Sequence, residues 1–248
     1  MSLSNRIEKM NDPLYPLSSK YDPKWIIDNH MGSHCLWLTE ALTKNLQLKP
    51  GMRVLDIGCG KALSSIFLAK EFGVEVCAFD LHVNVTENWE RIKEVNAHGL
   101  VFPMHGDALD MPFADEVFDA IISINSIWSY GLDEGFADMQ LARIVKPGGQ
   151  IAIAVPGMLN ELTEIPEYLK PYWHPDFANY HSPAWWNTLW AKSASIAVDV
   201  IDAFADNEGV RIWRDFLWIL DPNECVGMDI DNGRNLSFLR LLATKRSG

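Results

Sequence analysis

The chain has 248 residues, of which 48% are hydrophobic and 22% are charged, and its formal net charge at pH 7 is −12. This length suits one domain, or one domain with a cap, and the apolar share is ample for a core. The acidic balance opposes binding to a phosphate backbone, so we expect no nucleic acid as a partner. No signal peptide and no apolar run long enough to span a bilayer are expected, so we predict no membrane association.

The four cysteines are scattered, with no Cys-x-x-Cys pair and no His/Cys cluster at metal-ligand spacing. We therefore expect reduced thiols, a cytoplasmic location and no bound metal.

The N-terminal fifth of the chain predicts a helical piece that precedes the first strand. Residues 1–21 look irregular, and residues 23–30 suit a short helix with Pro23 in its first turn. Ser33 is a plausible N-cap for a second helix that ends before Pro50. This piece could close over a ligand or only pack against a sheet, and the sequence leaves both readings open.

The next stretch predicts a strand, a glycine turn and a helix. Val54, Leu55 and Ile57 form a short apolar run typical of a buried strand, and helical spacing follows over residues 61–72. Gly58 and Gly60 let the backbone turn sharply and approach a ligand, because neither has a Cβ. The turn leads into a helix N-terminus, whose free N–H groups face whatever lies there.

The glycine pattern distinguishes between two kinds of nucleotide site. A dinucleotide fingerprint needs glycine at its sixth position, where this chain has Leu63. The pattern acid-x-Gly-x-Gly-x-Gly is met instead at Asp56, Gly58 and Gly60, with Ala62 in the last position. A carboxylate at Asp56 suits a ligand with an ammonium group and hydroxyls better than a pyrophosphate. The plain alternative is a turn that only packs a strand against a helix.

Further acids follow the next predicted strands. Residues 75–79 suit a strand that ends in Asp80, where nucleotide-binding α/β folds hold a ribose hydroxyl pair, although Asp80 could instead cap the next helix over 85–97. A third strand over 100–105 is followed by Asp107 and Ala108, a carboxylate that can accept from an adenine amino group beside a small residue.

A fourth strand over 118–124 ends at Asn125, which would line the site from below. A helix over 133–145, a turn over 146–149 and a fifth strand over 150–155 follow. Strands that alternate with helices and carry ligand-type residues at their carboxyl ends predict a doubly wound α/β sheet.

The stretch 52–156 resembles the core of the class I S-adenosylmethionine-dependent methyltransferases, best matching the small-molecule branch that includes quinone and cyclopropane-lipid methyltransferases. The matching pieces are Val-Leu-Asp-Ile-Gly-Cys-Gly at 54–60, Asp80, Gly-Asp-Ala-Leu-Asp-Met-Pro-Phe at 106–113, Phe-Asp-Ala-Ile-Ile-Ser at 118–123, and Leu-Ala-Arg-Ile-Val-Lys-Pro-Gly-Gly at 141–149. They occur in the family's order and spacing, with Ala62 a mild departure.

The resemblance implies a Rossmann-like, mainly parallel seven-stranded sheet with N-terminal helices and a helical insertion after the fifth strand. It implies one methyltransferase domain over 1–248, with a helical cap at 1–50, a cofactor-binding core at 51–156, and a substrate cap with edge strands at 157–248. The cofactor would be S-adenosyl-L-methionine and the partner a small-molecule methyl acceptor, in a possible homodimer.

The family's cofactor contacts carry over residue by residue as hypotheses. Asp56, Gly58 and Gly60 would contact the methionine part, and Asp80 would hold the ribose hydroxyls. The remaining assignments place Leu81 against the adenine, Asp107 on its amino group with Ala108 beside it, and Asn125 on the sugar or the amino-acid end.

The last third of the chain predicts a helix over 183–192 with Ser182 as N-cap, a strand over 197–204, a helix over 208–220 and a strand over 236–243. The two strands agree with the antiparallel edge strands of the methyltransferase sheet. Aromatic residues crowd residues 168–190; most would pack a cap, and a few would line a substrate site.

Methyl transfer needs a general base only when the acceptor is a neutral hydroxyl, amine or carbon acid. Candidate bases are His34, His174, His181 and Tyr130, of which His34 and His181 are preferred. Two alternatives to a methyltransferase remain: a module that binds S-adenosylmethionine without chemistry, and a dinucleotide oxidoreductase, which Leu63 and Asp56 disfavour.

Overall fold

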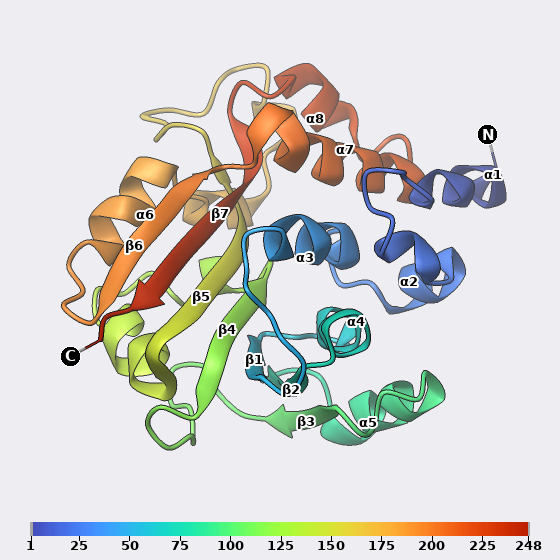
Figure 1. Ribbon diagram of the computed structural model, residues 1–248. Helices are drawn as coiled ribbons and strands as arrows, with labels where there is room; N and C mark the ends of the chain where they lie inside the picture. The colour runs from blue at the N-terminus through green and yellow to red at the C-terminus, as the bar shows by residue number, and fades with distance from the viewer. Residues whose placement is uncertain (1, 248) are drawn as a thin grey trace.

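The computed structural model describes residues 2–247, so the expectations for Met1 and Gly248 lie outside the described residues. Seven strands form one sheet in the order β3-β2-β1-β4-β5-β7-β6 (Figure 1). Their bounds are β1 Arg53–Ile57, β2 Glu75–Asp80, β3 Val101–His105, β4 Phe118–Ile124, β5 Val145–Met158, β6 Ile196–Ala203 and β7 Leu236–Lys245. The helices are α1 Leu3–Ile7, α2 Pro23–Asn29, α3 Cys35–Thr43, α4 Leu63–Phe72, α5 Val85–Glu94, α6 Pro183–Trp190, α7 Glu208–Leu220 and α8 Val226–Asp231.

The first five strands are parallel, and β7 pairs antiparallel with both β5 and β6. This confirms the predicted mainly parallel sheet with an antiparallel pair at one edge. The register places Ile57 opposite Phe79 and Asp80 opposite His105, so the carboxyl ends of β1, β2 and β3 meet at one edge. The order reverses at β1, because β2 and β4 flank it, which is where open α/β sheets bind ligands.

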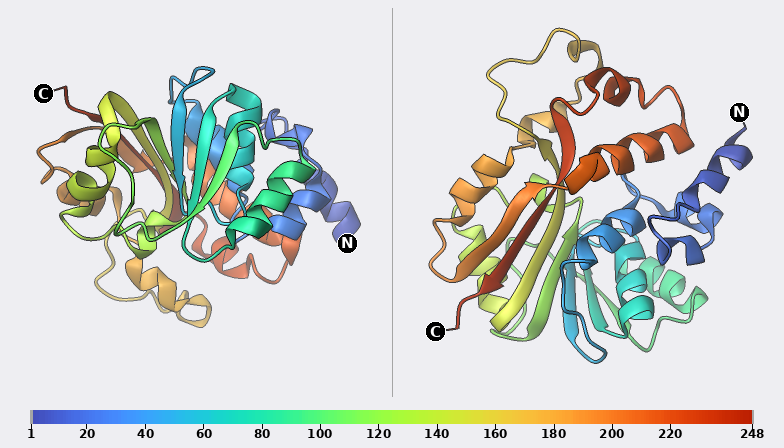
Figure 2. Two further views of the ribbon diagram at one scale, coloured as in Figure 1. Left: turned by 90° about the horizontal axis from the view of Figure 1, so that it is seen from below. Right: turned by 45° about the horizontal axis from the view of Figure 1, so that its top comes forward.

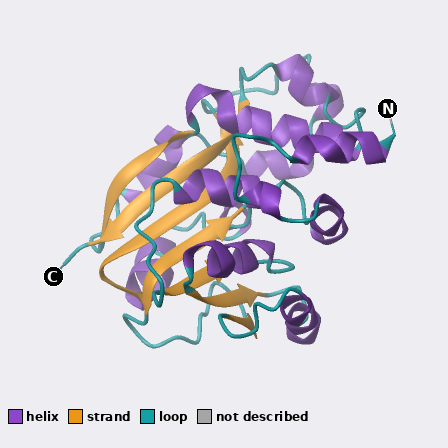
Figure 3. Ribbon diagram, turned by 45° about the vertical axis from the view of Figure 1, so that its right-hand side comes forward, coloured by secondary structure: helices purple, strands orange, loops and turns teal. Residues whose placement is uncertain are grey.

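Helices cover both faces of the sheet, as the alternation of side chains along a strand requires. Val54 on β1 belongs to the core beneath α3, α4 and α7, whereas its neighbour Leu55 faces the core beneath α6. Most of the helices in Figure 3 lie along one side of the sheet, and Figure 1 shows α6 on the other. The doubly wound architecture is therefore confirmed.

Two local expectations differ from the structure. His34, not Ser33, caps α3, because its Nδ1 accepts from the backbone N–H of Trp37 at 3.2 Å. The helix expected over 133–145 is a π-helical turn at Ala137–Ala142. Arg143 just after it donates to the carbonyl oxygens of Phe113 and Met111, tertiary contacts that no local pattern encodes.

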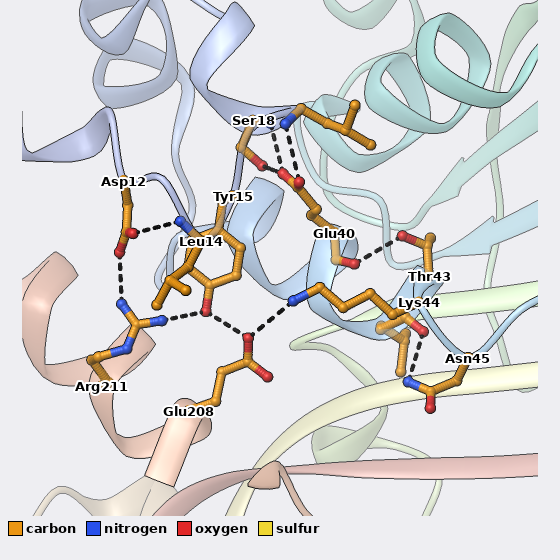
Figure 4. Close-up of polar contacts among 12 residues, drawn as sticks. Asp12, Leu14, Tyr15, Ser18, Glu40, Thr43, Lys44, Asn45, Glu208 and Arg211 are labelled. Carbon is orange, nitrogen blue, oxygen red and sulfur yellow. Dashed lines mark hydrogen bonds and ion pairs between the residues drawn. The ribbon is translucent and has the colours of Figure 1, made fainter. Parts of the chain in front are cut away.

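The N-terminal segment is ordered rather than irregular, with α1 and two short 3₁₀ turns before α2. The buried carboxylate of Glu40 accepts from the backbone N–H of Ser18 at 2.7 Å and from its hydroxyl at 2.6 Å (Figure 4). The Tyr15 hydroxyl lies 2.9 Å from Oε1 of Glu208 and accepts from Arg211 at 2.8 Å. The segment is thus tied to both α3 and α7.

The long connection between β5 and α6 loops out beside α7 and α8, in gold at the top of the right-hand view of Figure 2. Its apolar residues pack on those helices in a small separate core that includes Met158, Met228 and Leu236. The helix α8 was not predicted, because its six residues carry no apolar periodicity long enough to show.

Candidate functional site

A cavity of about 620 Å³ opens at the carboxyl ends of β1, β2 and β4. Seven of the eight predicted cofactor residues lie in its wall, although they come from four separate stretches of the chain. These are Gly58, Gly60, Asp80, Leu81, Asp107, Ala108 and Asn125.

The turn after β1 leaves no space for a side chain at Gly58 and little space at Gly60. Gly58 has φ +67° and Gly60 has φ +53°, both in the left-handed region. A Cβ on Gly58 would lie 2.2 Å from the Ser126 hydroxyl oxygen, and a Cβ on Gly60 would lie 2.9 Å from the Met31 sulfur. The backbone here is bare toward the cavity and leads into α4 at Leu63. This is the form of cradle that an adenosyl-methionine group needs.

Asp80 fixes that turn as well as facing the cavity. Its Oδ2 accepts from the backbone N–H of Gly60 at 2.8 Å, and its Oδ1 accepts from those of His82 and Val83. A carboxylate offers about four lone-pair positions, so one remains for a ligand hydroxyl. Asn84 and not Asp80 caps α5, so the capping alternative for Asp80 does not hold.

The loop after β3 carries a second carboxylate of the cavity wall, that of Asp107. Oδ1 of Asp107 accepts from the backbone N–H of Leu109, while no hydrogen bond to its Oδ2 is recorded within residues 2–247. Ala108 beside it is buried, and Leu81 is exposed at the cavity mouth. The three residues lie in one wall of the cavity, an acceptor with two apolar neighbours, which matches what an adenine ring requires.

Asp56 lies behind the cavity and not in its wall. Its Oδ2 accepts from the hydroxyls of Ser64 and Ser65, both at 2.6 Å, and Ser64 does reach the wall. Its Oδ1 is buried with no hydrogen-bond partner among the described residues. Burial raises the pKa of Asp56 to about 6, against the opposing effect of the two serine hydroxyls. Asp56 could therefore influence a bound group in two ways, through the serines of α4 or through the charge of its own carboxylate.

The floor of the cavity comes from the segment after β4. The Tyr130 hydroxyl lies 2.8 Å from the Ser126 hydroxyl, which donates to the carbonyl oxygen of Ile57 at 3.0 Å. Burial raises the pKa of Tyr130 well above its usual value, so this hydroxyl stays protonated. Asn125 has φ +56° and is held by its backbone N–H, which donates to Ala154 at 2.7 Å.

One wall of the cavity is formed by the end of α2, the segment between α2 and α3, and the start of α3. Asn29 there accepts from Arg91 of α5 at 2.7 Å, and Met31 lies over Gly60. His30, Ser33 and the start of α3 complete this wall. The sequence predicted that this piece could cover a ligand, but it gave no signal for the particular residues, because they follow no motif.

Neither preferred base lies in the cavity wall. His34 is fully buried, stacks on Trp37 with ring centroids 4.0 Å apart, and has a pKa lowered by burial to about 3. His181 stacks on Trp185 at 3.7 Å and faces Glu161. The geometry gives no support for either residue as the base. Of the other two candidates, His174 is exposed and Tyr130 lies in the wall.

Within residues 2–247, no helix is long and apolar enough to cross a membrane, and no cluster of three or more His, Cys, Asp or Glu side chains is arranged to hold a metal ion.

Residues 54–149 match the family described as a methyltransferase domain. A demethylmenaquinone methyltransferase of Listeria welshimeri is 28% identical over 195 residues, which cover 72% of this chain and 80% of the relative.

Two solved structures share the fold. A geranyl diphosphate C-methyltransferase from Streptomyces coelicolor, solved with Mg²⁺, geranyl diphosphate and S-adenosyl-L-homocysteine, is 18% identical with a TM-score of 0.67, covering 84% of this chain and 78% of that one. A phosphoethanolamine N-methyltransferase from Haemonchus contortus, solved with S-adenosyl-L-methionine, is 20% identical with a TM-score of 0.71, covering 100% and 60%. By its domain match, its relatives and its sheet order, the chain is similar to S-adenosylmethionine-dependent methyltransferases that act on small molecules.

Proposed function

We propose that the 620 Å³ cavity is the S-adenosylmethionine site of this methyltransferase and that its methyl group passes to a small organic acceptor. One observation carries the proposal: residues from four stretches, chosen from the sequence alone, line a single cavity beside a turn that leaves no space for a side chain at Gly58.

The residues present fit the cofactor part by part. Gly58 and Gly60 would let the methionine portion lie against bare backbone. The remaining lone pair of Asp80 would accept from a ribose hydroxyl, and the free oxygen of Asp107 would accept from the adenine amino group. Asp56 would contribute negative charge from behind the wall rather than a direct contact.

When bound, S-adenosylmethionine supplies a methyl group on a positively charged sulfur that is already a good leaving group. The chain has then mainly to align the acceptor and exclude water. Met31, which lies over the glycine turn, would help to exclude water. The protonated Tyr130 hydroxyl would act as a hydrogen-bond donor or acceptor and not as a base, because its pKa is raised.

The named relatives methylate chemically different molecules, as their names state: demethylmenaquinone, geranyl diphosphate and phosphoethanolamine. By analogy we assign this chain a small organic acceptor. The domain division at residues 50 and 156, the homodimer and the cytoplasmic location stay predictions from the sequence.

Calorimetry with S-adenosyl-L-homocysteine and with NAD tests the cofactor. We expect saturable binding of the first and none of the second, and the reverse result would contradict the proposal. Incubation with methyl-labelled S-adenosylmethionine and a metabolite extract then tests the transfer. Tight binding with no label transferred to any small molecule would favour the non-catalytic binding module, which the comparisons do not support.

A further inference from the structure

A second, smaller cavity of about 150 Å³ adjoins the first, on the side of α7 and the loop before α6. The two cavities share Ser33 and Asn125 in their walls. A group in the small cavity would thus lie next to whatever occupies the large one. This adjacency is what a methyl acceptor requires, because the reacting atoms must come within about 3–3.5 Å of each other.

The small cavity is walled by aromatic rings that brace one another. Trp213 of α7 packs against Tyr180 and Phe238, with ring centroids 5.9 Å and 5.1 Å apart. Phe216, one turn further along α7, completes this side. These aromatic residues come from α7, β7 and the loop before α6, so the tertiary structure alone assembles the wall.

No charged side chain lines the small cavity. Its nine lining residues include no Asp, Glu, Lys, Arg or His. A carboxylate or phosphate placed there would lose its hydration and gain no charged partner, which is unfavourable. The charge of a phosphate-bearing acceptor would therefore be unpaired here.

Polar side-chain groups that can bind a ligand lie instead where the two cavities meet, at Ser33 and Asn125. The Ser33 hydroxyl is buried and has no hydrogen-bond partner among residues 2–247. No hydrogen bond to the Asn125 side-chain amide is recorded in the same part of the chain, although its backbone is fixed at both ends by Ala154 and Trp128. A buried hydroxyl without a partner is destabilising, and a hydrogen bond to a ligand hydroxyl or carbonyl would offset that cost.

The size of the cavity sets the size of the group. An apolar protein cavity of about 150 Å³ holds one benzene molecule. Two fused rings would need the walls to move apart.

We propose that this small cavity is the acceptor subsite and that it takes one uncharged six-membered ring bearing a hydroxyl or carbonyl, whose oxygen is held at Ser33 and Asn125. The inference rests on the proposed function, because it needs the cofactor in the adjoining cavity. It selects against charged and two-ring acceptor groups in this subsite.

The test is calorimetry on the full chain saturated with S-adenosyl-L-homocysteine. Four probes are compared: phenol, 4-hydroxybenzoate, tetramethylammonium and 1,4-dihydroxynaphthalene. We expect phenol to bind saturably and at least about 10-fold more tightly than the other three, which corresponds to about 1.4 kcal/mol. Tighter binding of the anion, the cation or the two-ring probe would overturn the assignment.

Two variants locate the probe. Leu217→Phe adds volume in the wall of the small cavity only. We expect this variant to bind phenol at least 10-fold more weakly and to bind S-adenosyl-L-homocysteine with unchanged affinity. Leu220→Phe makes the same change on the same helix outside both cavities, and it should leave both affinities unchanged. Equal loss of phenol binding in the two variants would contradict the site.

Ser33→Ala separates a binding role from a structural one. Because its hydroxyl has no partner in the protein, its removal should leave the melting temperature unchanged or higher, while phenol binds more weakly and toluene equally well. Weakening of both probes alike would argue against a polar contact at Ser33. If S-adenosyl-L-homocysteine itself fails to bind the unaltered chain, the proposed function fails; if it binds and phenol does not, only the subsite fails.

Discussion

The backbone N–H of Gly60 donates to Oδ2 of Asp80 across 2.8 Å, so the carboxylate at the end of β2 holds the glycine turn that follows β1. The two residues are 20 positions apart in the chain: Asp80 ends β2, and Gly60 lies in the turn after β1, the neighbouring parallel strand. A residue expected to hold a ligand thus also shapes the loop on which that ligand would lie.

Replacing Asp80 should therefore affect both binding and stability. Asp80→Ala leaves three backbone N–H groups without their acceptor. We expect the free energy of unfolding to fall by about 1–3 kcal/mol. We also expect the affinity for S-adenosyl-L-homocysteine to fall at least 10-fold. Asp80→Asn keeps one carbonyl oxygen and should retain more stability but still lose affinity. Thermal melts and calorimetry with S-adenosyl-L-homocysteine measure the two effects; unchanged affinity in both variants would remove Asp80 from the site.

Gly58→Ala should abolish cofactor binding, because the new methyl group would overlap the Ser126 side chain at a backbone conformation already unfavourable for alanine. Gly51→Ala is the matched control, since Gly51 also has a positive φ but nothing lies within 4 Å of its Cβ position. We expect each variant to lose about 1–2 kcal/mol from backbone strain, with an additional loss only at Gly58. If the Gly58→Ala variant still binds S-adenosyl-L-homocysteine, the cofactor does not lie against the backbone at Gly58.

Two buried groups should give the protein an unusually flat stability profile between pH 4 and 6. The pKa of His34 is lowered to about 3, so the unfolded chain binds a proton below about pH 6.5 that the folded chain does not, and stability falls as pH falls. The pKa of Asp56 is raised to about 6, so the folded chain keeps a proton that the unfolded chain has lost, and stability falls as pH rises. The two slopes oppose each other at about 1.4 kcal/mol per pH unit each.

Single variants should expose each slope. In His34→Asn, which keeps an acceptor for the Trp37 N–H, unfolding free energy from denaturant titrations should decrease from pH 4 to 6. In Asp56→Asn, it should increase over the same range. Profiles that match the unaltered chain in both variants would show that neither group is as buried in solution as in the structure.

The Glu40 contact predicts that the wall formed by residues 26–33 depends on an anchor outside the cavity. Glu40→Ala removes the acceptor for the backbone N–H groups of Leu17 and Ser18. We expect faster proteolysis before α3 and a KM for S-adenosylmethionine raised several-fold, with kcat less changed, because the wall would be loosened. Lys24→Ala, which removes an exposed ion pair with Asp28 on the same segment, should change neither. Equal cleavage rates for the two variants would refute the anchor.

Local sequence patterns were enough to predict much of the lining of the 620 Å³ cavity. Buried strands, the glycine turn and the acids that follow β2 and β3 are local patterns, and parallel strands bring their carboxyl ends to one edge whatever else the chain does. That is why Gly58, Asp80 and Asp107 could be placed in one site before any coordinates were known.

The tertiary structure decided the rest, because the rest depends on contacts between segments that share no motif. Asp56 lies behind the cavity wall, where the hydroxyls of Ser64 and Ser65 of α4 donate hydrogen bonds to its Oδ2. His34 is buried as the N-cap of α3. The tertiary structure also joined Trp213 of α7 to Tyr180 of the preceding loop to form the small cavity. Local spacing records which face of an element is apolar, but not which distant element that face will meet.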